Sequence, residues 1–137
     1  MPKANCIFVV DDDPSARNGL ARLLRTAGHE VRDFASVNEF LNALFRGVSG
    51  CVVLDARMPG RSGEELEAEL KTRGIDLPII VVSADDDQET RSRAHKMKAA
   101  GFFRKPVDGA ALLDAIDWAL RSRSTGGNQN NSDAAQR

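Results

Sequence analysis

A run of apolar residues that ends on a single carboxylate constrains the fold of this chain more than any other stretch. Residues 51–54 read Cys-Val-Val-Leu, Asp55 follows them directly, and Pro59 and Gly60 then form a turn signal. A short apolar run bounded by turn residues is typical of a strand that is buried in a sheet. Ligands bind at the carboxyl ends of the strands in open α/β sheets, so we expect Asp55 to lie at a binding site.

Hydrophobic patterning predicts four more strands and five helices around this run. The strands are expected at 7–10, 29–34, 78–83 and 102–104. Apolar residues at helical spacing follow each strand, and residues suited to N-caps or capping boxes precede most of these stretches. The helices are expected to begin near Asp13, Ser36, Ser62, residue 85 and Asp108, and the first three to end at Gly28, Gly47 and Gly74.

The alternation of strands and helices indicates a parallel sheet that is covered by helices on both faces. The crossovers should be right-handed, and the near-continuous apolar strands at 7–10, 51–54 and 78–83 fit a sheet buried on both faces. The predicted fold is therefore α/β, a flavodoxin-like doubly wound parallel sheet of five strands in the order 2-1-3-4-5 with five helices. The weaker strand at 29–34 is placed at the edge of the sheet.

Chain length and composition favour one domain, predicted to span residues 1–121 of the 137. From residue 122 small polar residues dominate, so 122–137 is expected to be a disordered tail or an interdomain linker. The net charge of −1 gives no reason to expect direct nucleic-acid binding, and no apolar run approaches a membrane span. Cys6 and Cys51 are expected to be buried free thiols, which fits a cytoplasmic protein.

Polar side chains are predicted to meet at the carboxyl edge of this sheet. Asp11 and Asp12 follow the first strand, Asp55 ends the third, Ser83 ends the fourth and Lys105 follows the fifth. Strands one and three flank the point where the strand order reverses, so the three carboxylates should share one crevice. Carboxylates this close repel one another unless cations intervene. Lys105 would offset one charge, and Mg²⁺, which prefers oxygen ligands, would offset the rest.

This set of residues suits the transfer of a phosphoryl group to a carboxylate. A carboxylate can attack phosphorus and hold an aspartyl phosphate, and the transfer mainly requires that the charge on the phosphoryl oxygens be neutralised. Mg²⁺, the Lys105 ammonium and the Ser83 hydroxyl would each take one of those oxygens. Taken singly, Asp11 and Asp12 are better explained by a helix cap and a solvated turn, Asp55 could simply start a turn, and Ser83 and Lys105 carry almost no signal. All of these explanations would have to hold together at the ends of four strands, which is a larger coincidence than one shared site.

The motifs at these strand ends resemble the receiver domain of bacterial two-component response regulators, and most of all the receivers of the nitrogen-fixation regulator and LuxR-type group. The resemblance covers roughly residues 5–121. It rests on Val10-Asp11-Asp12-Asp13-Pro14, Leu54-Asp55-Ala56-Arg57-Met58-Pro59-Gly60 with Ser62-Gly63, Ser83-Ala84 and Gly101-Phe102-Phe103-Arg104-Lys105-Pro106. It implies a phosphorelay signalling module that is not an enzyme, apart from catalysing its own phosphorylation and dephosphorylation.

The resemblance also implies roles for the residues of the crevice. Asp55 would accept the phosphoryl group from a sensor histidine kinase. Mg²⁺ would be bound by the Asp12 and Asp55 side chains, by the backbone carbonyl of Arg57 and, through water, by Asp11. Lys105 would bind the phosphoryl group. No organic cofactor is implied.

A switch is implied as well, in which Ser83 moves toward the phosphoryl group and Phe102 turns inward behind it. This change would alter the surface of the fourth helix, fifth strand and fifth helix, which controls an output domain or a partner protein. Trp118 lies off the apolar stripe of the fifth helix, so it either covers a neighbouring helix or anchors a phosphorylation-dependent homodimer or output domain. Arg57 and Asp85, each two residues past a site residue, are expected to meet across the site mouth.

Two other functions fit the strand pattern less well. An aspartyl-phosphate hydrolase of haloacid-dehalogenase type needs a second Asp two residues after the nucleophile, where this chain has Arg57. A flavodoxin-like nucleotide-binding module needs a phosphate loop rich in Ser, Thr or Gly after the first strand. This chain has three Asp residues there, which would repel phosphate.

Overall fold

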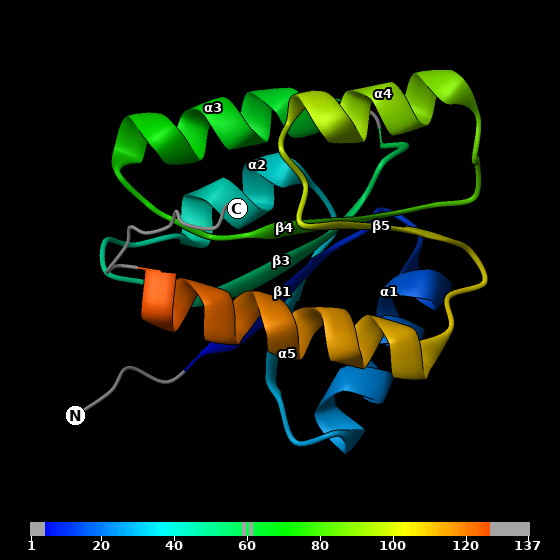
Figure 1. The fold of residues 1–137 in the computed structure, drawn as a ribbon, viewed down its shortest axis with the longest axis horizontal. Coiled ribbons are helices and arrows are strands. Elements are labelled where there is room, and N and C mark those ends of the chain that lie inside the picture. Colours follow the sequence, from blue (N-terminus) through cyan, green and yellow to red (C-terminus); the bar gives the residue numbers. More distant parts are fainter. Residues whose placement is uncertain (1–4, 59, 61, 127–137) are drawn as a thin grey trace, which may run out of the picture.

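Five parallel strands form one sheet in the order β2-β1-β3-β4-β5, which confirms the predicted topology (Figure 1). The computed structural model describes residues 5–58, 60 and 62–126, the last four by their backbone alone. The strands are β1 (Cys6–Val10), β2 (Glu30–Phe34), β3 (Gly50–Asp55), β4 (Ile79–Ser83) and β5 (Gly101–Arg104). The weakly apolar β2 lies at the edge of the sheet, where one of its sides needs no strand partner.

Helices cover both faces of the sheet. They are α1 (Pro14–Thr26), α2 (Val37–Ala43), α3 (Gly63–Arg73), α4 (Gln88–Lys96) and α5 (Gly109–Gly126). Figure 1 shows α1 and α5 on one face and α2, α3 and α4 on the other. Each helix runs from the carboxyl edge of the sheet back toward its amino edge, so the loops after the strands all gather on one side.

Local sequence accounts for where the helices begin. Asp13 caps α1, because its Oδ1 atom accepts a hydrogen bond from the Ser15 N–H at 3.1 Å. Ser62 and Glu65 form a complete capping box on α3, in which each side chain accepts a hydrogen bond from the other residue's N–H. Gly74 ends α3 with a φ of 70°, in the left-handed region that glycine adopts without steric cost.

Two helix ends differ from the prediction. The second helix ends at Ala43 rather than at Gly47, because Leu44 already has an extended backbone. The fifth helix continues to Gly126, so it includes residues 122–126 of the stretch that was predicted to be a disordered tail or an interdomain linker. Residues 122–125 contain no Pro or Gly that would stop the helix sooner. The rest of that predicted tail, residues 127–137, lies outside the described residues.

The strands are buried on both faces by two apolar clusters. One packs strand residues against α2, α3 and α4 and includes Phe8, Phe40, Val52, Leu66, Val81 and Ala94. The other packs strand residues against α1 and α5 and includes Ile7, Leu24, Val53, Ile80, Leu112 and Ile116. Cys6 and Cys51 are free thiols, as expected, but only Cys51 is buried, since Cys6 at the start of β1 is partly exposed. Within the described part of the chain, none of the helices is long and apolar enough to cross a bilayer.

Candidate functional site

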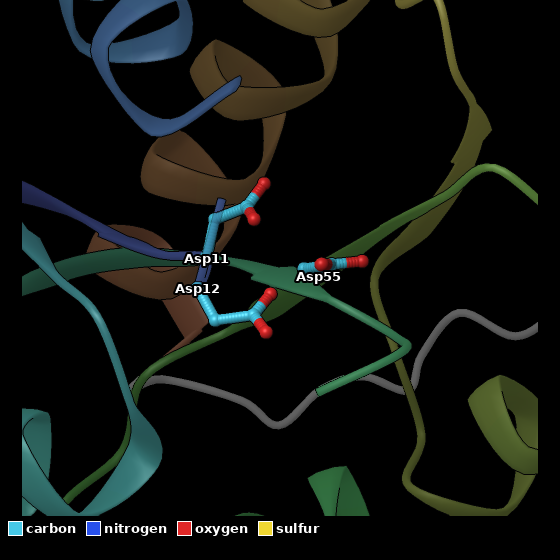
Figure 2. Close-up of side chains that lie close together, drawn as sticks. All are labelled: Asp11, Asp12 and Asp55. Atoms are coloured by element: carbon cyan, nitrogen blue, oxygen red, sulfur yellow. The ribbon is translucent and has the colours of Figure 1, made fainter. Parts of the chain in front are cut away.

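Three carboxylates meet where β1 and β3 end. Val10 pairs with Leu54 across these neighbouring strands, so the residues that follow them, Asp11 and Asp55, lie beside each other. Asp12 continues from the same strand end, and one oxygen from each of the three carboxylates lies within 4.8 Å of the others. Figure 2 shows the side chains rising from these two adjacent strand ends. The predicted convergence of the acidic residues is therefore present in the fold.

The sheet also brings the hydroxyl and the ammonium of the predicted site to this edge. Asp55 pairs with Val82, which places Ser83 one residue beyond it on the neighbouring strand β4. Ser83 in turn pairs with Arg104 on β5, and Lys105 follows directly. The backbone N–H of Lys105 donates a hydrogen bond to the Ser83 carbonyl at 2.7 Å, so pairing continues one residue past the end of β5. The Lys105–Pro106 peptide bond that follows is cis.

Lys105 reaches from β5 across the end of β4 and β3 to the acidic group. Its Nζ atom donates a hydrogen bond to the Asp11 Oδ2 atom at 3.0 Å and lies 3.8 Å from the Asp55 Oδ1 atom. The ammonium therefore pairs more closely with Asp11 than with the predicted acceptor. Asp11 is completely buried, so this contact compensates a carboxylate that is shielded from bulk solvent.

Backbone groups fix the directions of the two buried carboxylates. The Asp11 Oδ1 atom accepts a hydrogen bond from the Asp13 N–H at 3.0 Å, and the Asp55 Oδ1 atom accepts one from the Arg57 N–H at 3.2 Å. Arg17, on α1, donates from its guanidinium to the Asp11 carbonyl at 2.8 Å. This contact of Arg17 with Asp11 could not be predicted from the sequence. Its spacing of six residues from Asp11 is not a recognised motif, and only the packing of α1 against β1 brings the two together.

Burial and charge shift the pKa values of two groups in the crevice. Burial raises the pKa of Asp55 from 3.8 to about 6, and the charge of Asp11 adds to the effect, while the Arg57 N–H and Lys105 oppose it. Burial alone would lower the pKa of Lys105, but its hydrogen bond to Asp11 and the charges of Asp55 and Asp11 outweigh burial and raise that pKa. The crevice thus holds more negative charge than one ammonium neutralises.

The residues of the predicted switch lie on neighbouring strands. Ser83 is buried, and its Oγ atom accepts a hydrogen bond from the Asp85 N–H at 3.0 Å. Phe102 pairs with Val81 on β4 and is half-buried, with the guanidinium of Arg91 over its ring. The role of Arg91 is not predictable from the sequence, because a positive residue in a highly charged helix carries no sign of an aromatic partner.

The expected contact between Arg57 and Asp85 is confirmed. The two side chains form an ion pair between the segment after β3 and the loop after β4. That loop carries three consecutive acids, and the last of them, Asp87, caps α4 by accepting a hydrogen bond from the Thr90 N–H at 2.9 Å. The charged stretch at 85–98 therefore forms the predicted helix, which begins at Gln88.

The donor set of the crevice fits a hard divalent cation. Three carboxylates supply the ligand oxygens, and burial, with a smaller contribution from the charge of Asp11, raises the pKa of Asp55, so a cation that stabilises its charged form fits there. Asp12 is exposed while Asp11 and Asp55 are buried, so the group is open on one side. Mg²⁺ binds through one or two carboxylates and keeps several waters, which matches such an arrangement.

Known proteins share both the sequence and the fold of this chain. Residues 7–117 match the family described as the response regulator receiver domain. The chain is 44% identical over 117 residues to the transcriptional regulatory protein TdiR of Thauera aromatica, covering 85% of this chain and 52% of TdiR. It is 39% identical over 129 residues to the transcriptional regulatory protein FixJ of Azorhizobium caulinodans, covering 94% of this chain and 61% of FixJ.

Solved structures agree with this match. The response regulator StyR superposes with a TM-score of 0.81 at 42% identity, covering 90% of this chain and 62% of that one. The structure titled FixJ-N superposes with a TM-score of 0.79 at 31% identity, covering 88% of this chain and 96% of that one. The hydrolase and the nucleotide-binding alternatives find no support in these matches. The chain spans about half the length of TdiR, and it belongs to the receiver domain family of two-component response regulators.

Proposed function

We propose that Asp55 is the phosphoacceptor of this receiver domain and that a sensor histidine kinase is its phosphoryl donor. The observation that carries the proposal is the position of Asp55 between two other carboxylates and one ammonium at the end of β3. Asp55 is 8% exposed, so a donor can reach it only from the mouth of the crevice. Asp11 is completely buried and bonded to Lys105, which leaves it unsuited to attack a donor.

In the proposed transfer, a carboxylate oxygen of Asp55 forms a P–O bond while the P–N bond to the kinase histidine breaks. The electrons of the broken bond leave with the imidazole nitrogen. Negative charge on the three outer phosphoryl oxygens must be neutralised, and the Lys105 ammonium already lies 3.8 Å from the Asp55 Oδ1 atom. Ser83 would turn its hydroxyl from the Asp85 N–H toward a second oxygen.

Mg²⁺, when bound, would supply the positive charge that the crevice lacks. We assign its ligands to the Asp12 and Asp55 side chains, to the Arg57 backbone carbonyl and, through water, to Asp11. The hydrogen bonds of Asp11 support its indirect role, because its Oδ2 atom already accepts from Lys105 and its Oδ1 atom from the Asp13 N–H. The domain itself would catalyse only its own phosphorylation and dephosphorylation.

The phosphorylated form would act through the surface of α4, β5 and α5. Phe102 lies on β5, Ser83 ends the neighbouring strand β4, and Trp118 on α5 is 59% exposed, so it is available to a partner. We propose that an output domain, a separate partner protein or a second copy of the domain binds this surface in the cytoplasm. The net charge of −1 supports no direct binding of nucleic acid by this chain.

Labelling with acetyl phosphate and Mg²⁺ tests the assignment of Asp55. The wild-type domain is expected to take up one phosphoryl group, which hydroxylamine removes as it does other acyl phosphates. Asp55→Asn should abolish the labelling, whereas Asp114→Asn, which removes an exposed carboxylate on α5, should leave it unchanged. Stoichiometric labelling of the Asp55→Asn variant would refute the proposal.

A further inference from the structure

Arg91 on α4 contacts two elements of the predicted switch at once. Its guanidinium carbon lies 5.0 Å from the centre of the Phe102 ring on β5. Its Nε atom also forms an ion pair and hydrogen bond with the Asp86 carboxylate, in the loop between β4 and α4. One side chain therefore joins the aromatic of the switch to the loop that follows the switch serine.

The loop that Arg91 holds is the segment that Ser83 must move. Its three acids each have a different partner: Asp85 pairs with Arg57, Asp86 pairs with Arg91, and Asp87 caps α4. A displacement of Ser83 toward the crevice pulls on this loop, because the loop continues directly along the chain from Ser83, the last residue of β4. The contact between Asp86 and Arg91 ties the loop to α4 and therefore resists this displacement.

We propose that Arg91 is a positioning residue whose contacts with Phe102 and Asp86 hold the switch in the unphosphorylated arrangement. This inference rests on the proposed function, since it concerns how readily the phosphoacceptor site activates. In the described arrangement Phe102 is half-buried and one face of its ring lies against the guanidinium. A ring that turned further inward would lose that face-on contact, so the contact favours the half-buried position in which the ring lies.

The chemistry of the three groups agrees with this role. A guanidinium over an aromatic ring is attracted by the negative face of the ring, and a carboxylate at its edge fixes the plane in which it lies. The pKa of Arg91 is raised and that of Asp86 is lowered by their mutual hydrogen bond, so both stay charged. The contacts are exposed and therefore weak, which suits a switch that a single phosphoryl group must reverse. Removing the two contacts should shift the equilibrium between the unphosphorylated and the activated arrangement of the switch by roughly two- to fivefold toward the activated one.

The first test measures the ring position in the unphosphorylated protein. With ¹³C-labelled phenylalanine, Arg91→Met should change the ring resonances of Phe102 and remove the ring-current shift of the side-chain protons at position 91. Arg93→Met is the matched control, because Arg93 lies on the same helix and pairs with Glu89 at 2.8 Å without a ring contact. If Arg91→Met leaves the Phe102 resonances as they are in wild type and in the control, the proposal is wrong.

The second test measures activation by beryllofluoride with Mg²⁺, which imitates the phosphoryl group. Arg91→Met should raise the apparent affinity roughly two- to fivefold, Asp86→Asn should raise it by less, and Arg93→Met should not change it. Equal or weaker binding by Arg91→Met would overturn the inference. If wild type itself binds no beryllofluoride, the phosphoacceptor assignment fails instead, and the resonance test still decides whether Arg91 positions the ring.

Discussion

Arg57 and Asp85 form an ion pair that joins the segment after β3 to the loop after β4. Each lies two residues past a strand-end residue of the predicted site, Asp55 or Ser83, so we expect the pair to lie across the mouth of the crevice. Exposed ion pairs contribute only about 0–1 kcal/mol to stability. The position of this pair matters for another reason, because hydrolysis of an aspartyl phosphate requires water in line with the bond to phosphorus.

We therefore expect the Arg57–Asp85 pair to prolong the life of the phosphorylated form. Arg57→Ala should speed the loss of phosphate by about two- to fivefold, because an ion pair worth about 0–1 kcal/mol can slow the approach of water only by such a factor. Asp85→Ala should speed it by a similar factor. The double variant should add little to either single change. The measurement is the decay of the phosphorylated protein in Mg²⁺ after the donor is removed. Unchanged rates in both single variants, or fully additive effects, would exclude the gate.

A second prediction concerns the cation site. Asp12→Asn should weaken Mg²⁺ binding by roughly tenfold or more, because a full negative charge next to a divalent ion is lost. Calorimetric titration with Mg²⁺ measures the affinity. Asp13→Asn is the control, since the Asp13 side chain caps α1 and is not among the three grouped carboxylates. Equal losses in the two variants would mean that general charge, rather than coordination by Asp12, governs binding.

A third prediction concerns stability in the absence of metal. The pKa of Asp55 is raised from 3.8 to about 6, so folding disfavours its charged form. The protonated group therefore stabilises the fold fully below about pH 4, and this contribution is lost as the pH rises through about 6. Asp55→Asn replaces the carboxylate with an uncharged amide of nearly the same shape. At neutral pH it should therefore raise the free energy of unfolding by about 1–3 kcal/mol.

Urea unfolding in EDTA at pH 7.5 checks this third prediction. The gain should shrink when Mg²⁺ is present, because the cation stabilises the wild-type carboxylate and binds the variant less tightly. Asp12→Asn removes an exposed charge from the same cluster and should raise stability by much less. A variant Asp55→Asn that is less stable than wild type in EDTA would show that the buried charge is well compensated.

A fourth prediction concerns the exposed face of α5. Trp118 is 59% exposed and lies on one side of the helix with Ala111 and Ala115, which are half-buried. If it anchors a phosphorylation-dependent dimer, Trp118→Ala should weaken association of the beryllofluoride-activated form by about tenfold. The phosphorylation rate should stay unchanged. Equal dimerisation of variant and wild type in sedimentation velocity would remove this role for Trp118.

The sequence by itself determined the elements and their order. Short apolar runs such as 51–54, which are bounded by turn residues and alternate with helical stretches, favour strands buried in a parallel sheet. Asp13 and Ser62 mark helix starts through hydrogen bonds that span two or three residues. Because the strands are parallel, their polar last residues had to gather at one edge. The acidic crevice was predictable for that reason, before any distance between its side chains was known.

Only the tertiary structure decided which charges pair within that crevice. Lys105 bonds Asp11, 94 residues away in the chain, more closely than Asp55, and the packing of β5 beside β4 sets that choice. Arg91 meets Phe102 for a similar reason, since a helix and a strand must dock before the guanidinium can cover the ring. Such contacts join residues whose local sequences carry no mark of each other. They depend on register and side-chain direction, which are properties of the packed sheet and helices together.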